Sequence, residues 1–327
     1  MASESVALPA SISSALRSAA ADTEVILEHF PVAPGQRDEI RVRRFDPYAR
    51  GAKIWLHRGR SEAQELPRST RQHFLGRSSD GTAGIALHLD PTSGALSGMV
   101  VGGRGSVDLQ ASPDGPSRLE VVAKELQDAH LETTCGGEKL PVPFDAMLRA
   151  SAPQIGEPPA FSRMSATFEA VIAVDTDNEL LDIRFSNNTA TATNYLADLF
   201  VEMNVYYQRD LSLTLLQGDT FLRVDPDPNP TYDDDPWNVT ASPAQGANLS
   251  EFGSYWASNM GSVDRVFAML LSGKSSSEFS SSGIAWVDGY CETQSTGGGY
   301  SVSQTFLFTS NTVNSGVRLI GHELGHN

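Results

Sequence analysis

The sequence contains little cysteine, with only Cys135 and Cys291 among 327 residues. Two cysteines are too few for the disulfide framework of a small secreted scaffold, so the cysteine content does not indicate the cellular compartment of the protein. Long apolar runs are also absent, and no stretch approaches the roughly 20 apolar residues of a membrane-spanning helix. The first 20 residues have neither a basic segment nor an uninterrupted apolar segment. We therefore expect no membrane span and recognise no clear signal peptide.

Basic residues are in deficit. Lys and Arg number 24 against 40 Asp and Glu, which gives a formal net charge of −16. Such a charge repels phosphate backbones and anionic lipids, so we expect neither nucleic acid nor a membrane surface as a partner. The length is sufficient for two domains, each with its own hydrophobic core.

The first part of the chain consists of short apolar or alternating runs that are separated by turn residues. The runs cover residues 23–32, 38–45, 52–58, 84–90, 98–103 and 118–126. This pattern is typical of short β-strands. We predict a β-rich domain over residues 1–150, followed by a proline-containing linker over residues 151–165.

From residue 166 onward, expected strands alternate with expected helices, which predicts an α/β or α+β domain with a mixed sheet over residues 166–327. Strands are expected at 167–175, 211–218, 264–273, 283–290 and 300–308, and helices at 190–208, at 249–260 behind Asn248, and at the end of the chain. The residues SNNT before position 190 are typical of a helix N-cap.

The end of the chain carries the motif with the clearest chemistry. His322 and His326 are four residues apart, so a helix presents both imidazoles on one face. Zinc accepts such nitrogens in tetrahedral sites. Glu323 follows the first histidine, where a carboxylate can take a proton from water whose pKa the metal has lowered. The motif therefore indicates a zinc site with Glu323 as general base.

The alternative is a solvated amphipathic helix with two incidental histidines. By chance, H-E-x-x-H arises in roughly one chain in a hundred of this length. Gly321 and Gly325 each cost about 1 kcal/mol relative to alanine in a helix interior, so propensity alone does not favour a helix here. The other histidines all lie in the first part of the chain: His29, His57, His73, His88 and His130. The second part reserves its only two histidines for this motif, which favours the metal site.

The sequence GHELGHN resembles the zinc helix of the metzincins, and the asparagine after the second histidine makes it similar to the adamalysin/reprolysin-like branch. Upstream, TFEAVIAVDTD, YWASNMGSVDRVFAMLLSG and GIAWVDGYCE follow in the family's order. The resemblance implies a zinc metalloendopeptidase with protein or peptide substrates, secreted from the cell. It also implies the upper subdomain of a metzincin catalytic domain, which ends in the zinc helix.

The family pattern continues to a glycine and a third histidine ligand, which would fall at positions 329 and 332. We therefore expect the lower subdomain to lie beyond Asn327. The alternative is a non-catalytic binding module, or an inactive fragment, that retains the metzincin-like fold. Whatever follows Asn327 separates these two interpretations.

The resemblance also implies a role for the cysteines. In metzincin zymogens, a propeptide cysteine can occupy the zinc position that water needs, because a thiolate is a strong zinc ligand. Residues 1–150 would then be a pro-region that inhibits its own enzyme, with Cys135 as the latch. The alternative is a buried or incidental thiol. Cys291 matches a position where relatives have a cysteine bonded to one beyond the zinc helix, and a Cys135–Cys291 disulfide is the competing interpretation.

In such enzymes a substrate pairs backbone to backbone with the edge strand of the sheet. By position this strand is the stretch from residue 299 to residue 306, which makes Gly299, Tyr300, Ser301 and Val302 candidates for substrate binding. The alternative is an ordinary sheet edge that docks nothing.

Calcium is a second cofactor that the resemblance implies. Some family members hold a calcium ion with an acidic residue in the first strand and an aspartate before the third, and Glu169 and Asp264 match these positions. The alternative is a pair of solvated carboxylates.

Overall fold

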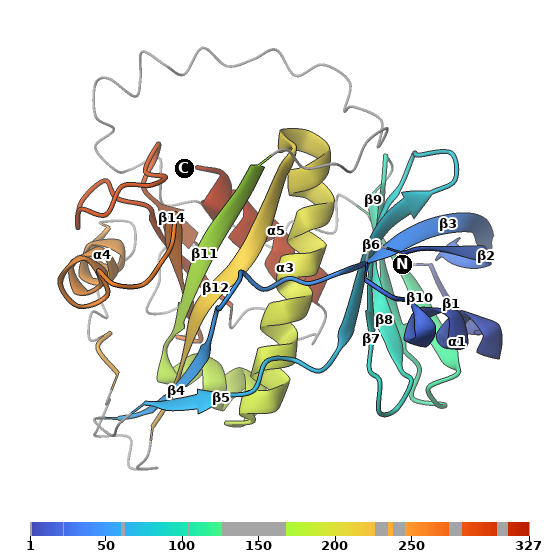
Figure 1. Cartoon of the computed structure of the whole chain (residues 1–327), viewed down its shortest axis with the longest axis horizontal. Helices are drawn as coiled ribbons and strands as arrows, with labels where there is room; N and C mark the ends of the chain where they lie inside the picture. Colours follow the sequence, from blue (N-terminus) through green and yellow to red (C-terminus); the bar gives the residue numbers. More distant parts are fainter. Residues whose placement is uncertain are drawn as a thin grey trace.

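The computed structural model describes residues 2–21, 23–59, 63–103, 105–125, 168–225, 235–237, 246–274, 283–305 and 313–326. It consists of two β-sheets with helix α3 (Thr189–Leu211) between them (Figure 1). Helix α5 (Val313–Gly325) lies beside α3. Within the described residues, no helix is both long and apolar enough to cross a membrane.

The first sheet has eight antiparallel strands in the order β1-β10-β9-β8-β7-β6-β3-β2. Their bounds are β1 Ser3–Ala7, β2 Glu24–Ala33, β3 Gln36–Phe45, β6 Gln72–Ser78, β7 Gly84–Leu89, β8 Leu96–Gly102, β9 Gly105–Ala111 and β10 Arg118–Glu125. Helix α1 (Ala10–Ser18) buries Ile12 and Leu16 against one face. The other face packs on α3. The predicted β-rich character is confirmed, whereas α1, β1, β6 and β9 were not predicted.

The second sheet has seven strands in the order β14-β15-β13-β11-β12-β4-β5. Its central strands are parallel, and β14 is antiparallel to β15. The strands from the second part of the chain are β11 Phe168–Thr176, β12 Leu213–Val224, β13 Phe267–Ser272, β14 Gly283–Ala285 and β15 Tyr300–Gln304. Helix α4 (Ala247–Asn259) covers the face opposite to α3 and α5. The predicted alternation of strands and helices and the mixed sheet are confirmed.

Two strands from the first part of the chain lie in this second sheet. Strand β4 (Ile54–Arg58) pairs in parallel with β12, and β5 (Gln64–Leu66) pairs with β4. Ile54 and Leu56 point into the core between the sheet and α3, so burial of these side chains favours the pairing of β4 with the second sheet. The two parts therefore do not fold as fully separate units. The predicted linker, residues 151–165, lies outside the described residues.

The helix starts show what sequence alone can predict about capping. Asn188 caps α3, because its side chain accepts a hydrogen bond of 3.0 Å from the Thr191 amide, as the SNNT cluster predicts. The expected start of α4 behind Asn248 is wrong by two residues. Gly246 is the N-cap there, with a φ of 70° that glycine adopts without strain.

Candidate metal centre

Helix α5 carries the histidine motif and is held by its apolar face. Val317, Ile320 and Leu324 recur at helical spacing and are buried in the core shared with α3 and the second sheet. This packing explains why a helix forms despite Gly321 and Gly325, because tertiary burial outweighs weak helix propensity. The predicted terminal helix is confirmed.

Two glycines of α5 differ in the space available for a side chain, so their replacement by alanine should change the stability of the protein in opposite directions. A Cβ at Gly321 would lie 3.8 Å from the Tyr207 ring, an ordinary contact, whereas one at Gly316 would lie 2.5 Å from Tyr195 Oη. We expect Gly321→Ala to raise the free energy of unfolding by about 0.5–1 kcal/mol, and Gly316→Ala to lower it by about 1–3 kcal/mol. Urea unfolding of both variants measures the difference. Effects of the same sign would contradict this packing.

The two imidazoles of the motif converge. His322 Nε2 lies 3.1 Å from His326 Nε2, and both rings and the Glu323 carboxylate offer ligand atoms within 4.8 Å of one another. Two nitrogens that share a tetrahedral zinc ion are about 3.3 to 3.4 Å apart, so the observed separation needs little change. His322 is exposed and His326 is half-buried.

The carboxyl group of Glu323 is fully buried beside these rings, with 0% of the residue exposed. Neither of its oxygens has a hydrogen-bond partner among the described residues. Desolvation raises the pKa of Glu323 to about 8. A buried carboxyl without a partner is costly, so its retention here points to a role other than stability. The two convergent imidazoles are donors that fit zinc, and the carboxyl lies beside them where it can act on a metal-bound water.

The comparison with known families agrees with this geometry. Residues 167–327 match a reprolysin-type family model described as metallo-peptidase family M12. This part of the chain belongs to family M12. No curated protein matches the chain. We call residues 167–327 the M12 part; the family supports the assignment of metallopeptidase chemistry and of zinc.

Strand β14 places a glycine against the carboxyl group of Glu323. A Cβ on Gly283 would clash with the carboxyl end of Glu323, so a glycine at this position lets the side chain lie where it does. Sequence reasoning missed Gly283, because a glycine at the start of a strand carries no signal of the helix that packs on it.

The end of α5 in the M12 part is held by hydrogen bonds to the carbonyl groups of its last residues and of His326, which follows the helix. Tyr207 of α3 donates to Gly321 O at 2.8 Å, and Tyr290 donates to Leu324 O at 3.2 Å. The amide of Asp288 donates to His326 O at 3.1 Å. These three donors fix the turn that carries both histidines. None of them has a recognisable sequence signal.

The prediction that residues 299–306 form the edge strand is wrong. Strand β15 lies between β13 and β14, and Tyr300, Ser301 and Val302 are almost completely buried. The reason is that β14 pairs with the outer side of β15, with Ile284 opposite Val302. Gly299 precedes this interior strand, so none of the four predicted substrate-binding residues lies at the edge. In the described part of the sheet, β14 is the edge strand on this side, with β5 at the opposite edge, and β14 contacts α5.

The other predicted site residues stay untested. Glu169 and Asp264 are exposed, and the register that pairs Ile172 with Phe267 puts both at the same end of β11 and β13. No third histidine, cysteine or carboxylate joins them within metal-binding distance among the described residues, so calcium remains a prediction.

The roles predicted for the cysteines also remain predictions. Cys135 lies outside the described residues, so its role as a latch is untested. Cys291 is exposed and forms no disulfide with any described residue.

Proposed function

We propose that the protein is a zinc-dependent endopeptidase in which His322 and His326 bind the metal and Glu323 is the general base. The observation that carries this proposal is the buried Glu323 carboxyl, without a partner among the described residues, beside two imidazole nitrogens that are 3.1 Å apart. Membership of family M12 supports metallopeptidase chemistry for this part of the chain.

The residues of the site divide the work of peptide hydrolysis. When bound, zinc supplies Lewis acidity that polarises the scissile carbonyl and lowers the pKa of a coordinated water. Glu323 takes the proton of the attacking water and delivers it to the leaving amine. The substrate backbone pairs with β14, because β14 is one of the two edge strands of the described sheet and Gly283 of this strand touches Glu323.

The test uses the full-length product of the gene, including any residues encoded after Asn327. Once activated by proteolysis, the protein should cleave an unfolded protein substrate, lose this activity after dialysis against a chelator, and recover it when zinc is added. Reading the coding sequence past Asn327 gives an independent check, because a glycine at 329 and a histidine at 332 complete the family pattern. A protein that binds such substrates but never cleaves them would instead support the non-catalytic binding module.

We also propose that the enzyme is made as a latent zymogen that acts outside the cell, with residues 1–150 as the pro-region. The position of Cys135 before the M12 part supports this proposal, because a thiolate there can occupy the water position on zinc. The strands β4 and β5 complete the second sheet, so we expect them to stay bound after activation. Cys135→Ala should activate the uncleaved chain, and continued latency of this variant would reject the latch.

Gly283→Ala is expected to lower kcat by about 10- to 100-fold without unfolding the protein. The new methyl group displaces the flexible end of Glu323, and a misplacement of about 1 Å in a catalytic group can cost a factor near 100. Peptidase kinetics and thermal unfolding measure the two effects. Gly261→Ala is the matched control, because nothing lies within 4 Å of a Cβ at that position. Equal kcat values in both variants would contradict the predicted displacement.

A further inference from the structure

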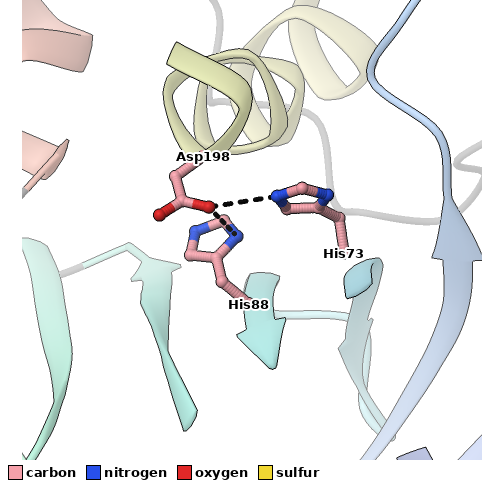
Figure 2. Close-up of side chains that lie close together, drawn as sticks. All are labelled: His73, His88 and Asp198. Carbon is pink, nitrogen blue, oxygen red and sulfur yellow. Dashed lines mark hydrogen bonds and ion pairs between the residues drawn. The ribbon is translucent and has the colours of Figure 1, made fainter. Parts of the chain in front are cut away.

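A second group of ionisable side chains lies between the first sheet and α3, away from the motif of α5. His73 of β6 and His88 of β7 point toward Asp198 of α3 (Figure 2). All three residues are at most 3% exposed. His73 Nε2 lies 3.0 Å from Asp198 Oδ1, and His88 Nδ1 lies 3.5 Å from the same oxygen.

An apolar cluster borders this group on one side. Leu75, Ala86 and Met99 of the first sheet pack there against Val201 and Val205 of α3. Burial of polar and charged groups in such an interface is costly, and apolar side chains of similar size often stabilise as well or better. Stability alone therefore does not account for two histidines and an aspartate at its centre.

Only one of the two ring nitrogens of His88 has a hydrogen-bond partner among the described residues. Its Nε2 lies 3.2 Å from Glu202 Oε1, whereas Nδ1 has no hydrogen-bond partner among the described residues. A neutral imidazole has a single N–H group. When the N–H group is on Nε2 and donates to Glu202, Nδ1 points a lone pair toward Asp198 Oδ1. His73 Nε2 approaches the same Asp198 oxygen. Two lone pairs that face each other in a buried site repel, and a cation between them removes the repulsion.

We propose that His73, His88 and Asp198 bind a divalent transition-metal ion, of which Zn²⁺ matches the donors best. The ligand atoms of the three residues lie within 4.8 Å of one another. Two imidazole nitrogens and one carboxylate oxygen are a common ligand set for zinc. This site shares no residue with the motif on α5.

The neighbouring side chains suit such a site. Glu202 accepts from His88 Nε2, which leaves Nδ1 as the ligand, and a carboxylate in this place is typical of metal-binding histidines. Arg71 donates to Asp198 Oδ2, which leaves Oδ1 for the metal. A cavity of about 440 Å³ that is lined by His88, Asp198 and Glu202 adjoins the group, with room for a water molecule as fourth ligand.

The position of the ion indicates a structural role. It ties β6 and β7, from the first part of the chain, to α3, from the M12 part. An ion that binds the folded protein but not the unfolded chain stabilises the fold, so this ion should hold the first sheet against α3.

The test uses the full chain without an affinity tag, carrying His322→Ala and His326→Ala so that the α5 site cannot contribute. After dialysis against Zn²⁺ and then against metal-free buffer, elemental analysis should find about one zinc per chain. Zinc should also raise its melting temperature by several degrees. Adding His88→Ala should abolish both effects, whereas adding His57→Ala, at a half-buried histidine outside the group, should preserve them.

Folding of each variant is checked by circular dichroism. If His88→Ala misfolds, Glu202→Gln replaces it; this change keeps the shape of the side chain and should weaken zinc binding by about 10- to 100-fold. Absence of zinc and of a thermal shift in the His322→Ala/His326→Ala protein would overturn the proposal. Full zinc retention in folded His88→Ala would also overturn it.

Discussion

Glu323→Gln is expected to lower kcat for peptide hydrolysis by about 10²- to 10⁴-fold, the range that general acid–base catalysis contributes. Glutamine keeps the size of the side chain, but it cannot take a proton from the attacking water. The metal should remain bound, because the two imidazoles hold it. Steady-state kinetics on the full-length gene product after its activation by proteolysis, and elemental analysis of the same preparation, measure both quantities.

Two control variants make this prediction specific. Glu292→Gln is the matched control, since Glu292 is exposed in the segment before β15 and should not change kcat. His322→Ala should lose both activity and the zinc of this site, which separates loss of the base from loss of the metal. Unchanged kcat in Glu323→Gln would reject the general-base assignment while leaving the metal site open to test.

Arg223→Met is expected to lower the free energy of unfolding by about 3–5 kcal/mol. Arg223 of β12 donates from Nε and Nη2 to both oxygens of Asp175 of β11, at 2.8 and 2.9 Å. The side chains are 7% and 0% exposed. Trp256 donates to the same carboxylate at 3.1 Å. The Thr176 amide also donates to Asp175 Oδ1, at 3.0 Å. Removal of the guanidinium leaves a buried negative charge that these two neutral donors compensate only in part, which accounts for the large effect.

Chemical denaturation of three variants tests this interpretation. Asp175→Leu combined with Arg223→Met should be less destabilised than Arg223→Met alone, because the double change removes both charges from the core. Lys53→Met is the control for an exposed pair, since Lys53 and Glu65 are about half exposed, and it should change stability by roughly 1 kcal/mol or less. Equal losses in the single and double variants would show that unpaired charge is not the cause.

Local sequence signals predicted much of the M12 part. The Asn188 cap, the alternation of strands with helices and the histidine motif all depend on residues that are close together in the chain. The edge strand was not predictable in this way. Strand β14 has only three residues, and its place outside β15 depends on pairing between segments that are distant in sequence.

The same distinction holds for the two groups of histidines. His322, Glu323 and His326 share one turn of helix, so their spacing alone brought them together. His73, His88 and Asp198 come from two strands and a helix, and cross-strand pairing with docking of α3 was needed to unite them. An aspartate among the apolar residues of a predicted helix was the one available signal.

The sequence by itself determined the chemistry at the end of the chain, because a helical repeat of four residues is a local property. Only the tertiary structure decided that Gly283 touches Glu323, that β4 and β5 complete the second sheet, and that a buried histidine group joins the two parts. These features arise from packing between distant segments, which burial of apolar surface drives and which no short stretch of sequence encodes.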